Sequence, residues 1–408
     1  MNITIQPTFL KGGITPPPSK SQAHRAVIAA ALSHGTSTLD NLTLSQDISA
    51  TLNCMAALGA QVEQTALTSV TIRGLSLPRE DAGLIPFDCG ESGSTLRFLI
   101  PIALAVAGGG TFTGHGRLME RPQQPYLDLF REKGVFYEQA DGVLTVKGHL
   151  TPGRYALAGN VSSQFITGLL YALPLLDGDS ELVLTTPLES EGYVDMTLET
   201  LSQFGVQVHR QADRFVIPGR QVFQSRDLRV ECDWSQAAFW YAAQRLGSAV
   251  EVCGMDSHST QGDRVILPYS QLLTVPGDTQ LDVSQCPDLV PALAAMAAVR
   301  QGTTYIVNAG RLHIKESDRL SSVTRVLTQM GAQVTELPDA LTITGKDGLE
   351  GGVRVDSYND HRIAMMAAIA ATRCAKPITV RNAGCVAKSY PGFWSDYASL
   401  GGLIQYED

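Results

Sequence analysis

Residues 359–383, NDHRIAMMAAIAATRCAKPITVRNA, open with four polar residues, continue as a run of small and apolar residues, and end in Ala-Lys-Pro before a β-branched stretch. A helix that is apolar on every side has to be buried. Asn or Asp at the start of such a run is typical of a helix N-cap. The stretch therefore predicts a helix at the centre of a domain, with its polar end at the N-terminus.

Five further segments share this pattern of a polar start, an apolar run and a turn into a strand. They start at SKSQAHR (19–25), ESGSTLR (91–97), VSSQF (161–165), DWSQ (233–236) and PDLV (287–290). Six buried helices in one chain predict an internal repeat.

A second set of segments alternates with the first and has the spacing of amphipathic helices that end at a glycine. Its members are TLNCMAALGAQVE (51–63), YLDLFREKGVFYE (126–138), TLETLSQFGVQVH (197–209), VTRVLTQMGAQVTE (323–336) and the fainter FWSDYASLGG (393–402). One further copy, near residue 268, lacks the glycine. Each repeat thus combines one apolar helix, one amphipathic helix and several short strands.

Because the apolar helices must lie inside, we expect an α/β protein in which the barrel is turned inside out. The prediction is six βαβαββ repeats in two domains of three repeats, with the break at Cys232 and Asp233 and a crossing segment at residues 12–18. The predicted N-terminal domain is 16–232, and the predicted C-terminal domain is discontinuous, 1–15 and 233–408.

Composition narrows the class of protein. The 408 residues are 44% hydrophobic and 17% charged, which is enough for real cores, and the net charge of −9 argues against a nucleic-acid partner. The N-terminal stretch lacks a signal-peptide pattern, and no apolar run approaches the ~20 residues of a membrane span. We expect a soluble, cytoplasmic protein, and an odd count of 7 cysteines without a CxxC pair predicts reduced core thiols.

Basic residues at the starts of the apolar helices point to a ligand. Arg25, Arg97 and Arg362 lie on otherwise apolar helices, where an unpaired guanidinium is costly, and few acids are near them in sequence. If the helices of each half direct their N-termini at the other half, an interdomain cleft would be suited to anions. Ser92, Asp233 and Ser235 are as readily explained as caps, and His24, His115 and His313 are weak signals that suit surface or cleft positions. No metal-ligand spacing, GxxxxGK loop or GxSxG elbow is present.

The segment KESDR, residues 315–319, precedes the amphipathic run from Leu320 to Met330 and is expected at a helix N-terminus. Taken alone it is explained as a solvated face with weak ion pairs, or as a site where an anion holds Lys315 and Arg319.

Seven ordered motifs, SKSxxxR, GxSGSTLRF, GRLMERP, GNVSSQF, IKESDRL, NDHRIAM and AKSYPGF, span essentially the whole chain. Together they resemble the motif set of the 5-enolpyruvylshikimate-3-phosphate synthases. The resemblance implies two inside-out domains of three repeats. It also implies transfer of the enolpyruvyl group of phosphoenolpyruvate to the 5-hydroxyl of shikimate 3-phosphate, with release of phosphate.

Carried onto this sequence, the family pattern implies two sets of ligands. The set for shikimate 3-phosphate is Ser21, Arg25, Ser162, Ser163, Gln164, Ser190, Tyr193, Asp288 and Lys315. The set for phosphoenolpyruvate is Lys20, Gly93, Arg97, Arg121, Gln164, Arg319, Arg362 and Lys388. In this scheme Lys315 and Arg319 of the KESDR segment each hold a different substrate.

The resemblance also implies catalytic roles. Glu316 is the expected acid that protonates the methylene carbon, Asp288 the expected base, and Lys20 an assistant in proton transfer and phosphate departure. Two positions depart from the commoner pattern: Glu91 stands where relatives often have Asn, and Arg311 replaces an Asn that contacts the shikimate moiety in relatives. Gly93 is the small residue associated with glyphosate sensitivity, so we expect sensitivity.

Two alternatives remain at this stage. A nucleotide-sugar enolpyruvyl transferase of cell-wall synthesis shares the fold but usually carries a Cys in the loop that reads TGHGRLMERP here. A non-catalytic phosphate-metabolite binder on the same scaffold would have no reason to keep Glu316 and Asp288. We expect no cofactor and no metal, no nucleic-acid or membrane partner, a monomer, and closure of the two halves when the anionic substrates bind.

Overall fold

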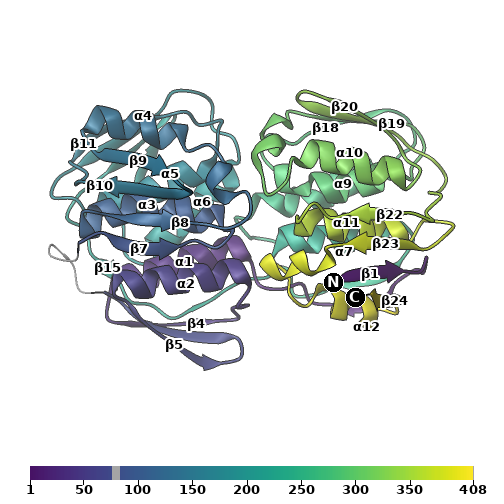
Figure 1. Ribbon diagram of the computed structural model, residues 1–408, viewed down its shortest axis with the longest axis horizontal. Helices are drawn as coiled ribbons and strands as arrows, with labels where there is room; N and C mark the ends of the chain where they lie inside the picture. Colours follow the sequence, from purple (N-terminus) through teal and green to yellow (C-terminus); the bar gives the residue numbers. More distant parts are fainter. Residues whose placement is uncertain (76–82, 408) are drawn as a thin grey trace. The chain divides into compact units, whose positions relative to one another are not determined.

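The computed structural model describes residues 1–75 and 83–407 and divides into two compact units (Figure 1). One unit is Pro18–Glu231, and the other joins Met1–Pro17 to Cys232–Asp408. The junctions therefore lie at 17/18 and 231/232, where the sequence predicted 15/16 and 232/233. No helix in the described residues is long and apolar enough to cross a membrane.

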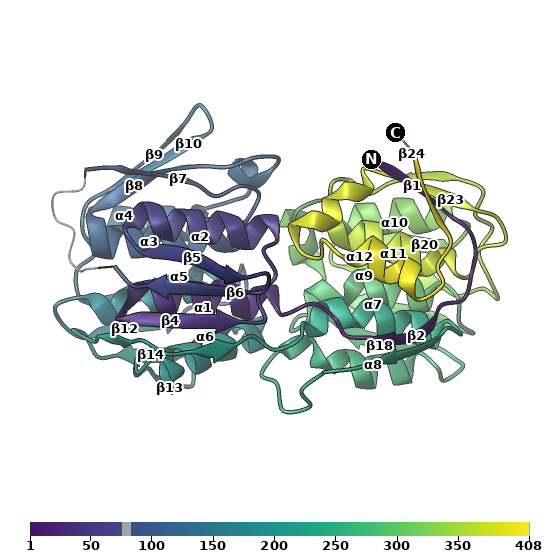
Figure 2. The ribbon, with the colours of Figure 1, turned by 90° about the horizontal axis from the view of Figure 1, so that it is seen from below.

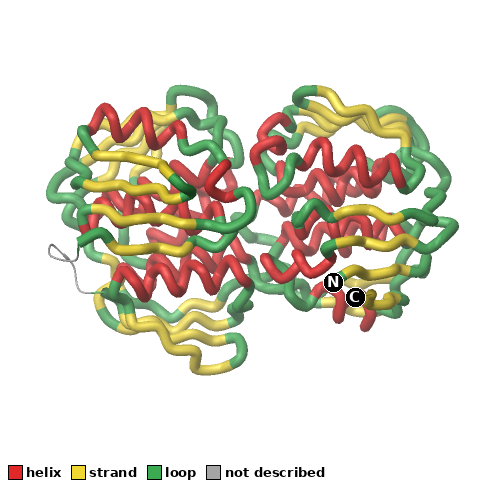
Figure 3. Tube along the Cα trace, viewed as in Figure 1, coloured by secondary structure: helices red, strands yellow, loops and turns green. Residues whose placement is uncertain are grey.

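Three apolar helices form the interior of the unit Pro18–Glu231. They are α1 (Lys20–Leu32), α3 (Gly93–Ala107) and α5 (Ser163–Ala172), the last continued by the 3-10 turn η2 (Leu173–Leu175). Every residue of α1 from Ala23 to Leu32 is buried, and α3 is buried along almost its whole length. Figure 3 shows these helices in red with yellow strands around them, which confirms the arrangement expected from their all-round apolar character.

Three four-stranded sheets surround these helices, and each has the same internal order. In the sheet β7-β8-β10-β9, for example, β7 pairs in parallel with β8, and the hairpin of β9 and β10 adds to β8 in antiparallel fashion. The strands of this sheet are β7 (Ile85–Asp88), β8 (Gly109–Thr113), β9 (Phe136–Ala140) and β10 (Val143–Lys147).

The other two sheets of this unit repeat the pattern. One is β11-β12-β14-β13, with β11 (Gly153–Leu157), β12 (Ser180–Leu184), β13 (His209–Gln211) and β14 (Arg214–Ile217). The other is β16-β4-β6-β5, with β4 (Thr36–Asp40), β5 (Gln61–Ala66), β6 (Ser69–Arg73) and β16 (Leu228–Arg229). A short pair, β3 (Ser33–His34) with β15 (Phe223–Gln224), completes the strands described here.

The amphipathic helices of this unit are α2 (Gln46–Leu58), α4 (Gln124–Lys133) and α6 (Glu191–Gln203). The glycine that ends the pattern, Gly59 or Gly134, takes a positive φ at the C-terminus of α2 and α4, the backbone conformation that favours glycine there.

Close packing of α3 on α5 fixes the backbone of α3 at Arg97. A Cβ at Gly168 would lie 2.5 Å from the carbonyl oxygen of Arg97, so only glycine permits this approach. Pro101 has no N–H to offer to the same carbonyl four residues earlier. The Tyr126 hydroxyl donates to it instead at 2.8 Å. The backbone at Arg97 is therefore held from two sides.

The second unit has the same plan (Figure 2). Its apolar helices are α7 (Trp234–Arg245), α9 (Val290–Ala297) with the preceding 3-10 turn η4 (Pro287–Leu289), and α11 (His361–Ala371). Its amphipathic helices are α8 (Ile266–Leu272) after η3 (Gly262–Val265), α10 (Arg319–Gln329), and α12 (Phe393–Ser399). The remaining 3-10 segments are η1 (Leu118–Glu120) in the first unit, and η5 (Gly310–Ile314) and η6 (Ala383–Lys388) in the second.

Two four-stranded sheets of the second unit follow the common pattern. One is β18-β19-β21-β20, with β18 (Thr279–Asp282), β19 (Thr303–Val307), β20 (Gln333–Leu337) and β21 (Ala340–Thr344). The other is β22-β23-β1-β24, with β22 (Arg354–Asp356), β23 (Ile378–Arg381) and β24 (Ile404–Glu407), and it takes β1 (Asn2–Ile5) from the chain's N-terminus. In Figure 1 the purple β1 lies beside the yellow β24.

The fourth repeat is shorter than the sequence predicted. Its sheet, within the described residues, is the pair β17 (Ala249–Val252) and β2 (Lys11–Ile14). Only residues 273–278 separate the end of α8 from the start of β18, and this length leaves no room for a hairpin. The N-terminal segment therefore supplies one strand to each of two sheets in the second unit.

Candidate active site

Five of the six apolar helices begin at capped N-termini, as their sequences predicted, whereas neither α9 nor the η4 turn before it has a side-chain cap. Ser19, Ser92 and Ser162 accept hydrogen bonds from backbone N–H groups in the first turns of α1, α3 and α5. Asp233 and Asp360 do the same for α7 and α11. Ser235 is not a cap, because its Oγ accepts from Nη2 of Arg362 at 2.5 Å.

Arg25 of α1 is buried among neutral oxygen atoms. It donates to the hydroxyls of Thr197 at 2.9 Å and Thr167 at 3.4 Å. It also donates to the carbonyl oxygens of Ser21 and Tyr193 at 2.7 Å each. Within the described residues no carboxylate forms an ion pair with it, and burial lowers the pKa of Arg25 to about 10 against the opposing influence of nearby tyrosines. An incoming anion would therefore be its charge partner.

Lys20, in the first turn of the same helix, has an acidic partner. Its Nζ lies 2.7 Å from Oδ2 of Asp47 on α2. Ser21 follows Lys20 and is half-buried, and its carbonyl holds Arg25. Sequence reasoning missed Asp47, which sits in the first turn of an amphipathic helix and resembles an ordinary helix-start acid.

Arg97 of α3 lies beside Gln164 of α5. Its Nη1 donates to Oε1 of Gln164 at 2.8 Å, and the Gln164 amide donates to Oγ of Ser94 at 3.0 Å. The guanidinium also stacks over the ring of Phe165, 4.6 Å from its centroid. These contacts hold Arg97 and Gln164 in fixed positions next to each other near the N-termini of α3 and α5.

Arg121 is a mostly buried cation with an unsatisfied hydrogen-bond donor in the described part of the chain. It follows η1, and the donor without a partner among the described residues is its Nε. A Cβ at Gly93 would lie 2.8 Å from Nη1 of Arg121, so the two residues are in direct contact. Glu91, two residues earlier, has its carboxylate against Gly116, because a Cβ built on Gly116 would lie 2.6 Å from Oε2 of Glu91.

The remaining residues predicted for shikimate 3-phosphate in this unit lie at two helix starts. Ser162 caps α5, and Ser163 is buried in its first turn. Ser190 precedes α6 with a φ of 56°, and Tyr193 lies in the first turn of α6, where its carbonyl meets Arg25. The structure thus brings α1, α5 and α6 together around Arg25.

In the second unit Asp288 of η4 lies among three cations. Its Oδ1 accepts from Lys315 at 3.2 Å and from Arg319 at 2.8 Å, and its Oδ2 accepts from Arg362 at 3.2 Å. Burial alone would raise the pKa of Asp288, but the charges of Arg362, Lys315 and Arg319 outweigh burial and hold the pKa well below its ordinary value. Asp288 is therefore an ionised carboxylate at neutral pH.

Arg319 connects three acids. It is 1% exposed and donates from Nε to Asp360 at 2.8 Å, from Nη1 to Asp288 at 2.8 Å and from Nη2 to Glu316 at 2.5 Å. Asp318 is the N-cap of α10, which starts at Arg319, so the helix start predicted for KESDR is confirmed. The solvated-face interpretation is wrong, because Arg319 and Asp360 are fully buried.

Two further predicted ligands and one departure lie near this cluster. Lys388 of η6 is buried and donates to the carbonyl oxygen of Asn359 at 2.6 Å. Burial lowers the pKa of Lys315 despite the opposing charge of Asp288. Arg311, one of the two positions expected to depart from the family pattern, donates to the carbonyl of Ser284.

The two clusters differ in charge. Around Asp288 the acids Asp288, Glu316 and Asp360 match the cations Lys315, Arg319 and Arg362. In the first unit, Arg25 and Arg121 form no ion pair within the described residues. Arg25 and Arg121 therefore carry positive charge that no ion pair offsets within the described residues. They are suited to bind the anionic groups of a ligand.

Outside the site, one sequence expectation was wrong, and those for His115 and for most of the cysteines were confirmed. His24 is buried in the core rather than at the surface, and its Nδ1 lies 2.7 Å from Oγ1 of Thr51. His115 is exposed and paired with Asp88 at 3.3 Å. The seven cysteines are free, as expected, but Cys253 is exposed while the others are buried.

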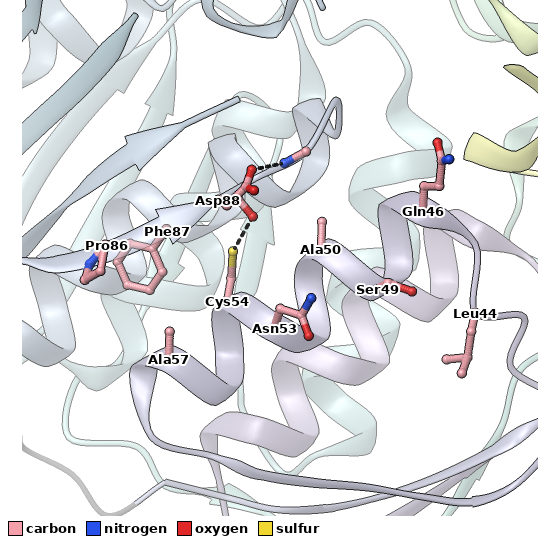
Figure 4. Close-up of a pocket in the computed structure, with 11 residues that line it drawn as sticks. Leu44, Gln46, Ser49, Ala50, Asn53, Cys54, Ala57, Pro86, Phe87 and Asp88 are labelled. Atoms are coloured by element: carbon pink, nitrogen blue, oxygen red, sulfur yellow. Dashed lines mark hydrogen bonds between the residues drawn. The ribbon is translucent and has the colours of Figure 1, made fainter. Parts of the chain in front are cut away.

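A surface pocket lies between α2 and β7 of the first unit (Figure 4). Cys54 and Asp88 meet in it, with Sγ of Cys54 donating to the carbonyl of Asp88 at 3.2 Å. Asp88 is the one charged residue among those that line it, and a hydrogen bond from the Gly90 amide lowers the pKa of this carboxyl. The pocket is thus negatively charged and unsuited to a phosphate.

Comparison with known proteins shows the family of this chain. The family profile described as EPSP synthase (3-phosphoshikimate 1-carboxyvinyltransferase) matches residues 5–273 and 276–397. The chain belongs to the EPSP synthase family. A relative from Clostridium novyi named 3-phosphoshikimate 1-carboxyvinyltransferase is 46% identical, with 99% of this chain and 98% of the relative covered. One of the same name from Clostridium kluyveri is 46% identical, with 98% of each chain covered.

Solved structures show the same fold. An EPSP synthase from Acinetobacter baumannii superposes with a TM-score of 0.81 at 24% identity, covering 99% of this chain and all of that one. The enolpyruvyl transferase NikO from Streptomyces tendae superposes with a TM-score of 0.77 at 18% identity, covering 99% of this chain and 98% of that one. The two-domain inside-out α/β architecture predicted from the repeats is therefore confirmed.

Sequence reasoning missed several residues that hold the EPSP synthase motifs in place. Asp360 was expected at a helix start, but its fork with Arg319 was not foreseen. Gln123 accepts from Nε of Arg97 at 3.4 Å and donates to the carbonyl of Arg121 at 3.2 Å, so it links two predicted ligands. The pattern GRLMERPQQ gave no signal for this link, because a glutamine beside prolines suits an ordinary loop.

Proposed function

We propose that this chain transfers the enolpyruvyl group of phosphoenolpyruvate to the 5-hydroxyl of shikimate 3-phosphate and releases phosphate. Membership of the EPSP synthase family supports this reaction. The structural observation that carries the proposal is Arg25, a buried guanidinium whose contacts are neutral oxygens. A buried cation without an acid needs an anionic ligand, and both substrates are phosphorylated acids.

In this proposal the cationic residues of the first unit bind the charged groups of the substrates. Arg97 and Arg121 present forked donors that match carboxylate and phosphate, and Lys20 offers a compact charge on the adjacent helix. Gly93 leaves the space beside Arg121 open, since a methyl there would lie 2.8 Å from Nη1. Arg25, Ser162, Ser163, Gln164, Ser190 and Tyr193 are assigned to shikimate 3-phosphate.

Asp288 is the proposed base that removes the proton of the attacking hydroxyl. Without substrate it is a weak base, because three cations contact its two oxygens. A substrate anion that draws Lys315 or Arg362 away would remove part of this stabilisation and raise the pKa of Asp288. Substrate binding would thus activate the base at the moment when the hydroxyl is in place.

Glu316 is the proposed acid that protonates the methylene carbon of phosphoenolpyruvate. Its Oε2 lies 2.5 Å from Nη2 of Arg319, a contact that favours the carboxylate over the acid. Delivery of a proton from Glu316 therefore requires Arg319 to engage phosphoenolpyruvate instead. Arg319, Arg362 and Lys388 are the assigned ligands of that substrate in the second unit.

The decisive assay is phosphate release from phosphoenolpyruvate with shikimate 3-phosphate, run beside UDP-N-acetylglucosamine as the competing acceptor. Release with shikimate 3-phosphate alone is the expected result. Release with the nucleotide sugar alone would move the assignment to a cell-wall transferase. Binding of both substrates without release would indicate a phosphate-metabolite binder.

A cytoplasmic location and a monomeric state are part of the proposal. Charged phosphorylated metabolites do not cross membranes unaided, so an enzyme that uses them belongs in the compartment that holds them. Cell fractionation tests the location, and light scattering after gel filtration tests the mass in solution.

A further inference from the structure

His313 has an acceptor at each ring nitrogen. Its Nδ1 lies 2.9 Å from each carboxylate oxygen of Asp318, and its Nε2 lies 3.1 Å from the carbonyl oxygen of Pro338. Asp318 also accepts from the amide of Ser321 at 3.2 Å as the cap of α10, which requires acceptor oxygens on that side chain. A neutral imidazole carries one N–H and would turn a lone pair toward one of these oxygens. The arrangement therefore fits an imidazolium with both nitrogens protonated.

The charges around His313 favour the same state. Asp318, in the same loop as His313, and Glu336 of β20 both raise the pKa of His313. Partial burial acts in the opposite direction, but the hydrogen bonds that His313 donates to Asp318 and to the carbonyl of Pro338 outweigh it, so the pKa of His313 lies above its ordinary value. The two cations closest to His313 in sequence have partners of their own: Lys315 contacts Asp288, and Arg311 contacts the carbonyl of Ser284.

The contact between His313 and Asp318 closes a short loop. Between these two residues the chain carries Lys315 and Glu316, and directly after Asp318 it carries Arg319. The same imidazole reaches Pro338 in the turn after β20, so it ties the loop to the neighbouring hairpin. The His313 side chain, at one end of the loop, thus contacts both Asp318 at the other end and the turn after β20.

We propose that His313, as a cation, is a positioning residue that holds the loop of Lys315 and Glu316 in the geometry needed for enolpyruvyl transfer. This inference rests on the proposed function, because it assigns a role relative to that reaction. His313 touches neither substrate in this scheme and acts through Asp318. Sequence reasoning gave it no such role, since a lone histidine near charged residues is a weak signal.

A metal ion bound between His313, Asp318 and Glu336 is an alternative to the proton, because these residues place potential ligand atoms within 4.8 Å of one another. A ligating nitrogen has to be unprotonated, yet Nδ1 is already at hydrogen-bonding distance from both Asp318 oxygens. Glu336 is also engaged, since its Oε1 accepts from the Ser321 hydroxyl at 2.7 Å. A proton explains these contacts better than a metal ion.

The first test observes the proton directly in the intact protein. In wild-type protein with nitrogen-15-labelled histidine, we expect both ring nitrogens of His313 to be protonated at pH 7, with deprotonation only at higher pH. The His313→Gln spectrum assigns the resonance. A single ring proton at pH 7, or a spectrum that changes on dialysis against a chelator, would overturn the proposal.

The second test separates charge from packing. For His313→Gln, which keeps a donor but no charge, we expect kcat/KM with shikimate 3-phosphate to fall roughly five- to tenfold, the size of one pKa unit of differential interaction. His313→Arg restores a cation with several donors, so it should return to within about twofold of wild type. It should also lack the wild-type decline as His313 deprotonates at alkaline pH.

His258→Gln is the matched control, because His258 lies in the same unit, is 94% exposed, and also faces an aspartate. It should leave both kcat/KM and the pH profile unchanged. Equal activity of wild type, His313→Gln and His313→Arg would overturn the positioning role, as would an Arg variant no better than the Gln variant.

The two proposals fail in distinguishable ways. Transfer activity with a neutral His313 at pH 7 would refute the inference and leave the proposed function intact. If His313 is doubly protonated but the protein does not transfer the enolpyruvyl group, the proposed function is refuted. His313 then has no role in catalysis, although its protonation state is as inferred.

Discussion

Gly93 and Arg121 touch where a side chain would collide: a Cβ at position 93 would lie 2.8 Å from Nη1 and 3.1 Å from Cζ of the arginine. Gly93 is the first residue of α3, and Arg121 is a mostly buried cation whose Nε has no hydrogen-bond partner in the described residues. The backbone at Gly93 does not have a positive φ, so space rather than conformation requires glycine here. The position of the guanidinium therefore depends on the absence of one methyl group.

Gly93→Ala is expected to weaken phosphoenolpyruvate binding. The methyl would displace Arg121, so KM for phosphoenolpyruvate should rise roughly tenfold with a smaller change in kcat, as for loss of a charge-assisted contact in the ground state. Steady-state kinetics with each substrate varied in turn checks this, since KM for shikimate 3-phosphate should change little.

The same variant should resist glyphosate, whereas the wild-type chain should be inhibited by it. Gly13→Ala is the control: a Cβ there would meet its nearest atom, Sγ of Cys253, at 3.9 Å, and the residue lies in an exposed strand. Uninhibited wild-type turnover in saturating glyphosate would contradict the expectation of sensitivity.

Asp360→Asn is expected to destabilise the second unit. Asp360 is fully buried and pairs with Arg319 through Nε at 2.8 Å, so the variant leaves a buried guanidinium with less compensation. Breaking a buried pair costs about 3–5 kcal/mol, and the Asn retains some hydrogen bonding, so we expect a loss of about 2–4 kcal/mol in the free energy of unfolding.

Urea unfolding followed by fluorescence measures this loss. Arg354→Gln, which breaks an exposed pair with Glu407, should change stability by less than about 1 kcal/mol. A similar effect of the two variants would show that burial of the Arg319–Asp360 pair does not matter.

Acid should remove a contribution of Asp288 to stability. Its folded pKa lies below the value of roughly 3.9 for an unfolded aspartate, because the cations Arg362, Lys315 and Arg319 outweigh burial. The contribution is present above about pH 4 and is lost as the pH falls from there toward the folded pKa. Urea midpoints between pH 3 and pH 7 should therefore fall less steeply for Asp288→Asn than for wild type, and parallel curves would contradict this.

Glu316→Gln should leave the substrates bound but slow the reaction. Loss of a general acid typically costs 10²–10⁴-fold in rate, so we expect kcat to fall by about that range while the dissociation constant of shikimate 3-phosphate changes only a few-fold. Quench-flow measures the chemical step and calorimetry measures binding. Glu350→Gln, at an exposed residue of the same unit that is not an assigned ligand, should retain full kcat.

Shikimate 3-phosphate should make the protein more compact in solution. Its proposed ligands include Arg25 in one unit and Lys315 in the other, and like charges on both would be neutralised by one anion. Small-angle scattering with and without the ligand measures the radius of gyration, and an unchanged value would refute closure.

Much of the fold could be predicted from the sequence, because helices that are apolar all round, such as the one from His361 to Ala371, can only be buried. The caps at Ser92 and Asp360 and the helix start at Arg319 follow from local chemistry that needs no tertiary information. The missing hairpin of the fourth repeat was not foreseen. The strands that complete that unit come from the distant N-terminus, and their pairing depends on contacts far apart in sequence.

The sequence by itself determined which residues carry charge at the starts of buried helices, since an arginine in an apolar run needs a partner wherever the helix is placed. Only the tertiary structure decided which partner each one has. Arg362 and Arg319 share Asp288, whereas Arg25 meets hydroxyls and carbonyls, because contacts between α1, α5 and α6 bring neutral oxygens to it and no acid. The reason is physical: burial and polarity are encoded locally, but the pairing of charges depends on distances that exist only once the helices have packed.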